Sequence, residues 1–159
     1  MKLYMKQKVF SFTDRFTVKD ELGADRYYVE GKLFSWGKQL FVYDAATGAE
    51  VAFIKQKVFS FLPRYYVFVG GVQYLEIVKE FTFLRPRYSI FGKDWQVQGD
   101  FFAHEYSVTQ NGELVVTIAK EWLTWGDTYA ITIGNPADEV AALATVLAID
   151  CAVDQQNDH

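Results

Sequence analysis

The stretch NPADEVAALATVLAIDCAV, residues 135–153, decides the architecture of this chain. It begins with the signals of a helix N-terminus. Asn135 is a favoured N-cap, and Pro136 suits the first helical position because its fixed φ is helical and its missing N–H is not needed there. Asp138 and Glu139 follow where the helix dipole favours negative charge. We therefore predict a helix over 135–153.

The same helix is apolar on all its sides. Between Val140 and Val153 only Thr145 and Asp150 are polar, so the helix must be buried all round. A membrane span needs about 20 consecutive apolar residues, and the run from Val140 to Ile149 has acidic residues on both sides. The interior of the protein itself is then the expected environment. A β-barrel of about eleven strands is wide enough to hold a central helix.

The rest of the chain contains the strands for such a barrel, because one segment recurs along it. MKQKVFSFTDRFTV returns as IKQKVFSFLPRYYV, and four looser copies share its aromatic core, its Pro-Arg-Tyr ending or its opening. The six copies span residues 5–18, 29–42, 54–67, 77–90, 97–108 and 118–131.

Turn signals divide the copies into strands. A glycine turn follows each copy, and Asn111-Gly112 is the strongest of them because both central positions of a type I′ turn need a positive φ. Weaker turns split the copies internally, as at Leu62-Pro63-Arg64 and Gly126-Asp127. Two strands per copy give about twelve. We predict a mainly β fold: a closed barrel of about twelve antiparallel strands, built from six two-stranded pseudo-repeats around the C-terminal helix. Imperfect alternation within the copies predicts a curved or bulged wall.

Length and composition predict one globular domain over 1–153, followed by a polar tail, 154–159. Half of the residues are hydrophobic and 18% are aromatic, which excludes a disordered chain. The N-terminus lacks the apolar core of a signal peptide. The single cysteine, Cys151, fits a reducing compartment. We expect a cytoplasmic protein, or one that is peripheral at the membrane.

The charge is unevenly distributed. The net charge is −4, which disfavours nucleic acid as a partner. Residues 1–93 carry 15 basic and 9 acidic residues, whereas residues 94–159 carry 1 and 11. Such asymmetry can mark an interaction surface, unless the fold interleaves the two parts and cancels the field.

Several segments together resemble the LURP-one-related family. They are KQKVFSF with Asp14-Arg15-Phe16, KEFTF, GDFFAHEYSV, KEWLTWGDTY and the helix with LAIDC. That family belongs to the tubby C-terminal-like superfamily, with the phospholipid scramblases. The resemblance implies a twelve-stranded barrel around a C-terminal helix. Tubby-type relatives bind phosphoinositide headgroups and scramblase-type relatives handle lipids, but no lipid-site motif of theirs maps onto this chain.

The candidate binding residues are cations that recur at equivalent places in the copies. If the copies lie side by side, these cations form a basic patch that would hold phosphate groups; the alternative is a solvated, charged barrel face. Aromatic neighbours would enter the same interface: Phe12, Phe16, Phe61, Tyr65 and Tyr66. The candidate lipid- or phosphate-binding residues are Lys6, Lys8, Arg15, Lys55, Lys57, Arg64, Arg85 and Arg87.

No catalytic or metal constellation is recognisable in the sequence. His104 and Glu105 are neighbours in a predicted strand, so they point to opposite faces, and no histidine cluster suggests zinc. We expect Cys151 to be a buried, inert side chain. Asp150 lies on the apolar helix. It either bonds the backbone or a basic group and fixes the helix register, or lies near the surface.

These observations favour a non-enzymatic binding module without a cofactor, which binds anionic lipid or another phosphate-bearing partner at a membrane surface. A protein-interaction or scaffold domain is the first alternative, and a shared exposed patch of Trp36, Trp95, Trp122 or Trp125 would favour it. An enzyme or small-ligand carrier is disfavoured, because the helix would occupy the cavity that a carrier needs.

Overall fold

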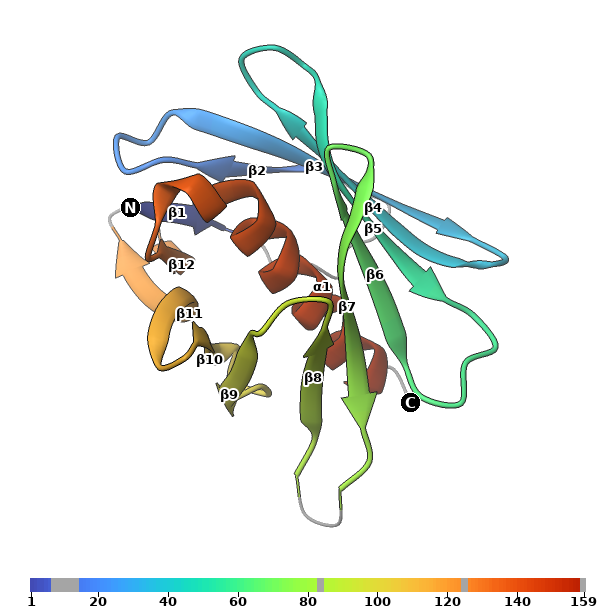
Figure 1. Cartoon of the computed structure of the whole chain (residues 1–159). Coiled ribbons are helices and arrows are strands. Elements are labelled where there is room, and N and C mark those ends of the chain that lie inside the picture. Colours follow the sequence, from blue (N-terminus) through green and yellow to red (C-terminus); the bar gives the residue numbers. More distant parts are fainter. Residues whose placement is uncertain (7–14, 83–84, 124–125, 158–159) are drawn as a thin grey trace.

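The computed structural model describes residues 1–6, 15–82, 85–123 and 126–157 of the chain. It contains strands, one short 3₁₀ helix and one long α-helix (Figure 1). The strands are β1 (Lys2–Met5), β2 (Arg15–Lys19), β3 (Asp25–Phe34), β4 (Gly37–Asp44), β5 (Glu50–Lys57), β6 (Arg64–Val69), β7 (Val72–Glu80), β8 (Arg87–Phe91), β9 (Gln96–Asp100), β10 (Glu105–Gln110), β11 (Glu113–Leu123) and β12 (Gly126–Ile133). The helices are η1 (Pro136–Asp138) and α1 (Glu139–Asn157).

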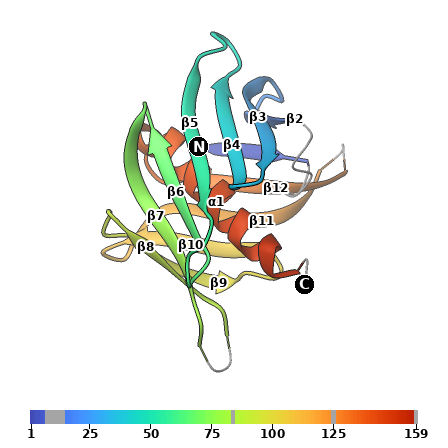
Figure 2. The same ribbon diagram turned by 90° about the vertical axis from the view of Figure 1, so that its right-hand side faces the viewer.

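The twelve strands form one closed antiparallel barrel in which β12 pairs with β1. Each strand otherwise lies beside its neighbours in sequence. Helix α1 runs through the middle of the ring (Figures 1 and 2). The predicted fold class is therefore confirmed, including the number of strands and the position of the helix.

The up-and-down order of the strands gives the barrel two distinct ends. The connections β1–β2, β3–β4, β5–β6, β7–β8, β9–β10 and β11–β12 all lie at one end. These six connections fall inside the six sequence copies. Because α1 starts after β12, its N-terminus lies at the opposite end and its C-terminus at this one. We call this the helix-C end. In Figure 2, α1 runs downwards to its C-terminal turns, towards the side on which β7 and β8 project.

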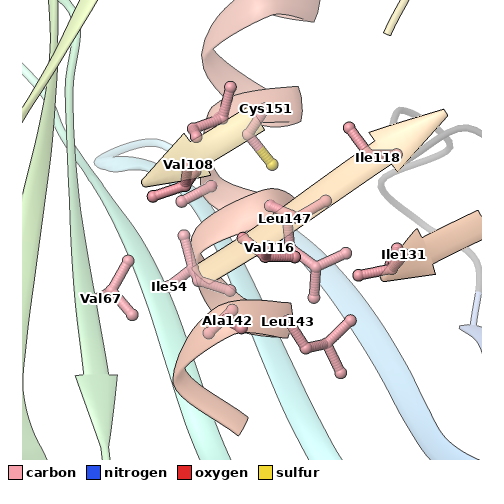
Figure 3. Packing of buried hydrophobic residues seen from close by; sticks show 14 of the residues in the cluster. Ile54, Val67, Val108, Val116, Ile118, Ile131, Ala142, Leu143, Leu147 and Cys151 are labelled. Atoms are coloured by element: carbon pink, nitrogen blue, oxygen red, sulfur yellow. The ribbon is translucent and has the colours of Figure 1, made fainter. Parts of the chain in front are cut away.

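The core fills the space between the wall and the helix. Along each strand, residues that face the core alternate with residues that face outwards. The inward-facing residues, such as Val29 of β3, Leu40 of β4 and Ile54 of β5, are buried against side chains of α1. Figure 3 shows Ile54, Val67, Val108 and Ile131 of the wall pointing towards Ala142, Leu143 and Leu147 of the helix. Residues 141–153 of α1 are all buried. The helix is thus the core onto which the wall packs.

Register shifts confirm the expected irregular wall. They put one extra residue into each of β3, β5, β7 and β11, for example Tyr74 of β7 opposite the step from Val67 to Phe68. Bulges of this kind bend a strand and increase its twist, which helps a sheet to close. At the predicted β10–β11 turn both Asn111 (φ 51°) and Gly112 (φ 81°) have the positive φ that a type I′ turn requires.

The predicted N-cap is confirmed, but the α-helix itself begins at Glu139, after the 3₁₀ turn η1, and its end also differs from the prediction. The Asn135 side chain accepts a hydrogen bond from the Ala137 N–H at 3.0 Å, as an N-cap does. The helix continues to Asn157 rather than ending at Val153, because nothing after Val153 breaks a helix. Gly126 and Asp127 belong to β12 and not to a turn. Among the described residues, no helix is long and apolar enough to cross a bilayer.

Candidate functional site

Three of the predicted cations lie together on the outer face of β5 and β6. Lys57 is directly opposite Arg64 in the register, and Lys55 is opposite Tyr66. Lys55 and Lys57 point to solvent because the alternate residues of β5, such as Ile54, point into the core. We call Lys55, Lys57 and Arg64 the basic strip.

Carboxylates neutralise part of the surrounding charge. Arg64 donates from Nη1 to Glu76 of β7, and the Nε of Arg87 lies 3.6 Å from Glu80. In the part of the chain that the structure describes, Lys55, Lys57 and Arg85 have no ion-pair partner. These three cations remain available to an external anion.

The other predicted cations lie further round the barrel. Arg15 is on β2, separated from the basic strip by β3 and β4, and its guanidinium lies 4.4 Å from the centre of the Tyr28 ring. Lys6 follows β1 at the helix-C end, and Lys8 lies outside the described residues. Arg87 is the first residue of β8, and Arg85 lies just before this strand. Copies one and three are therefore not side by side, since copy two lies between them.

A ring of exposed aromatic side chains surrounds the helix-C end. All of them lie in or beside the hairpin connections at this end, and we call them the aromatic rim. Phe59 and Phe61, in the β5–β6 connection, are 99% and 94% exposed. Among the described residues, Phe91 is the one other exposed Phe or Trp, and it lies towards the opposite end. The aromatic rim consists of Trp36, Phe59, Phe61, Phe81, Phe102 and Trp122.

The sequence located this rim only in part. Phe61 was expected at an interface and is exposed, but Phe16 and Tyr65 are buried in the core, because they occupy inward positions of β2 and β6. Phe12 lies outside the described residues. Trp95 is buried, so it contributes nothing to the surface. The signal that would have found the rim is that bulky aromatics occur at the internal turns of the copies, where the chain must be exposed.

A buried polar cluster joins the barrel wall to the last turns of the helix. The Tyr106 hydroxyl donates to Asp150 Oδ1 at 2.6 Å, and His104 Nδ1 lies 3.2 Å from the same oxygen. All three side chains are buried. Since a carboxylate only accepts, the cluster is satisfied when Nδ1 carries a proton. Of the two expected places for Asp150 the structure shows the buried, bonded one, with the Tyr106 and His104 side chains as its partners. His104 itself precedes β10, so the prediction that it lies in a strand is wrong.

This cluster has the composition of a catalytic site but not its accessibility. Two cavities, of about 790 Å³ and 560 Å³, lie along the junction of β8 and β9. Neither His104 nor Asp150 lines them. Among the described residues no group of three or more His, Cys, Asp or Glu side chains is suited to a metal ion. Cys151 is a free, fully buried thiol. The contacts of the cluster join the last turns of α1 to the wall at β10.

A second polar cluster fixes the other end of the helix. Arg26 donates to both carboxylate oxygens of Glu139, from Nε at 2.9 Å and from Nη2 at 3.0 Å, and the Tyr27 hydroxyl donates to Oε2. Burial raises the pKa of Glu139, but the hydrogen bonds from Arg26 and Tyr27 outweigh burial, so the pKa is lowered overall. Burial, together with Glu139, raises the pKa of Tyr27.

Comparisons with known proteins agree with this architecture. The model of the LURP-one-related family matches residues 1–150. The chain is similar to protein YxjI of Bacillus subtilis (strain 168), with 34% identity over 159 residues that cover 100% of this chain and 98% of the relative. The X-ray structure of a protein from Arabidopsis thaliana has a similar fold, with a TM-score of 0.60 and 15% identity; the match covers 94% of this chain and 90% of that one. The chain belongs to the LURP-one-related family.

Proposed function

We propose that this protein is a non-enzymatic binding domain that docks on anionic membrane surfaces with its helix-C end. The observation that carries the proposal is the gathering of exposed aromatic rings in the hairpin connections of one end of the barrel. Large exposed apolar groups that share one surface mark an interaction site. Six such side chains in a ring at one end of a molecule form a surface that is suited to a planar partner.

The β5–β6 hairpin is the main docking element in this proposal. Its tip carries Phe59 and Phe61, almost fully exposed, and its stem carries Lys55 and Lys57 without ion-pair partners among the described residues. Moving a Phe side chain from water into an apolar environment gains about 1.5–3 kcal/mol. Each lysine near an anionic leaflet adds about 1 kcal/mol. A hairpin with apolar tip and cationic stem therefore matches the layers of a bilayer surface.

The electrostatic part of this binding is expected to be weak and reversible. Arg64 is already held by Glu76, and Arg87 by Glu80, so few cations remain to contact lipid phosphates. The overall net charge is also negative. Binding should therefore depend on both apolar insertion and anionic lipid, and it should fall as salt shortens the Debye length from about 10 Å at 0.1 M.

The test is co-sedimentation of the full chain with two kinds of vesicle, one of phosphatidylcholine alone and one with added phosphatidylserine, at low and high salt. We expect more protein to sediment with the anionic vesicles at low salt. The variant Phe59→Ser/Phe61→Ser should lose this binding. Leu22→Ser is the matched control, because Leu22 is also 94% exposed but lies in the β2–β3 turn at the opposite end. Equal sedimentation with both vesicles would overturn the proposal.

A protein partner for the same rim is the second candidate. Trp36 is exposed and stacks on Phe34, with the ring centres 4.7 Å apart. A stacked pair is already rigid, and rigid exposed Trp side chains are frequent in protein interfaces. A chain that sediments with neither vesicle, but in which Trp36→Ala abolishes a protein complex, would favour this alternative.

A further inference from the structure

Among the described residues, the junction of the barrel wall with the fewest register pairs lies between β8 and β9. These strands share a single register pair, Ser89 with Gln96. In the part of the chain that the structure describes, every other neighbouring pair of strands shares at least two, and β3–β4 and β11–β12 share eight. We call the stretch from this pair towards Arg85 and Asp100 the seam.

Both strands of the seam are well paired on their other sides. β8 pairs with β7 over five positions, and β9 pairs with β10 over five. In an antiparallel strand, alternate residues direct their N–H and C=O groups to opposite flanks. Beyond Gln96, part of the β9 backbone therefore faces the seam, without register partners on β8 among the described residues. Such an edge is a template for a further strand.

The seam is open along its length. The cavity of about 790 Å³ is lined from one side by Arg85 and Pro86 and from the other by Gln98, Gly99 and Phe102. The second cavity, of about 560 Å³, continues along β8 and β9 as far as Gln96 and beyond. Pro86 has no N–H to offer to a strand partner, and proline in a sheet is confined to edges and bulges.

The side chains at the open end of the seam indicate the chemistry of its occupant. Arg85 is an exposed cation that has no ion-pair partner among the described residues, and Phe102 beside it is 55% exposed. Asp100 lines the same cavity, where its carboxylate accepts a hydrogen bond from the Ala103 N–H. An acidic side chain would pair with Arg85, and an apolar side chain would cover Phe102. The length of β9, five residues, corresponds to about 17 Å of extended chain.

We propose that the seam is a peptide-binding edge: it takes a short extended segment of a partner protein by strand addition to β9, with an acidic residue of that segment against Arg85. Main-chain hydrogen bonds supply the affinity in this mode, and the side-chain contacts at alternate positions supply the specificity. This function goes beyond membrane docking and uses the wall of the barrel, next to the aromatic rim. It stands or falls separately from the vesicle experiment.

A reversible cross-link of the seam tests the proposal. Extending the register from Ser89 and Gln96 by two residues brings Arg87 opposite Gln98, so Arg87→Cys/Gln98→Cys would staple the seam when oxidised. Cys151 is buried and will not compete. The full chain is used to select binders from a displayed library of short random peptides. We expect peptides with an acidic residue that bind the reduced variant and not the oxidised one.

Two further measurements keep the proposal falsifiable if the staple does not form. Arg85→Ala should weaken the selected peptides roughly tenfold or more, the loss expected for a charge-assisted hydrogen bond. Methylation of a backbone nitrogen of the peptide should abolish binding when it is placed at every second residue and have little effect at the residues between, which is the signature of strand pairing. Thr117→Cys/Thr132→Cys, across the well-paired β11–β12 ladder, is the matched staple and should leave binding unchanged. A library without binders, or binders that tolerate N-methylation at every position, would overturn the proposal.

Discussion

The buried cluster of Asp150 makes a prediction about stability that can be worked out from its contacts. Asp150 Oδ1 accepts the Tyr106 hydroxyl at 2.6 Å and lies 3.2 Å from His104 Nδ1. The change Asp150→Ala removes both contacts and leaves two buried polar groups to be satisfied. Tyr106 keeps one partner, because its hydroxyl lies 3.1 Å from the Val146 carbonyl oxygen and donates its single proton there once the carboxylate is gone. The imidazole of His104 loses its carboxylate.

The expected cost is large relative to the stability of a domain. Leaving a buried hydrogen-bonding group without its partner costs about 1–3 kcal/mol, whereas domains unfold with about 5–15 kcal/mol in total. A loss of 1 kcal/mol lowers the melting temperature of a chain of this size by about 2–4 °C, so Asp150→Ala should melt roughly 2–12 °C below the wild type. Asp150→Asn keeps an acceptor oxygen without the charge and should lose roughly half as much.

A double-mutant cycle in urea identifies the cause. Tyr106→Phe removes the hydroxyl and keeps the ring, which packs against Phe101 with the ring centres 5.5 Å apart. Groups in direct contact couple by about 0.5–3 kcal/mol, so the double variant Asp150→Ala/Tyr106→Phe should be less destabilised than the sum of the single variants. Strict additivity, or an Asp150→Ala variant as stable as the wild type, would refute the view that this cluster locks the helix to the wall.

Three other variants test the remaining parts of the architecture. A chain that ends at Gly134 loses the whole buried helix and should show no cooperative unfolding by calorimetry; a sharp transition near the full-length temperature would show that the helix is an appendage. Glu139→Gln tests the Arg26 cluster: the pKa of Glu139 is lowered by folding, so its stabilisation is complete above about pH 4.3 and lost as pH falls through the lowered pKa. The difference in unfolding free energy between wild type and Glu139→Gln should therefore shrink between neutral pH and pH about 3, and a constant difference would contradict this. Gly99→Ala should be destabilising in the same urea assay, because Gly99 has φ 145° and a Cβ there would lie 2.5 Å from the Tyr106 Cα; unchanged stability would show that this backbone relaxes freely.

The amino-acid order carried much of the information on the binding surface but not its layout. The repeat shows that Lys55 and Lys57 are equivalent to cations of the first copy. It does not show how far the cations of the two copies lie from each other, because that distance depends on β3 and β4 lying between the two copies. The exposure of Phe59 and the burial of Tyr65, six residues later, also depend on which residue begins β6. A shift of one residue exchanges the two faces of a strand.

The polar contacts of the helix show the same limit. An acid at position 150 of an apolar helix must find a partner, and that need follows from the sequence alone. The identity of the partners, His104 and Tyr106, follows only from the rotation of α1 against β10, which the packing of the whole core decides. The same holds for Glu139 and Arg26, which are far apart in the chain.

The sequence by itself determined the class of fold. A helix without a polar face has no stable place except inside a wide shell, and six repeated strand pairs provide a shell of that size. Local chemistry is sufficient for these conclusions, because burial and periodicity are properties of short segments. Only the tertiary structure decided where the aromatic rim and the seam lie on the molecule. The closure of the ring brings the aromatic turns to one end and leaves the seam between β8 and β9, and closure depends on twist, bulges and register summed over the whole barrel.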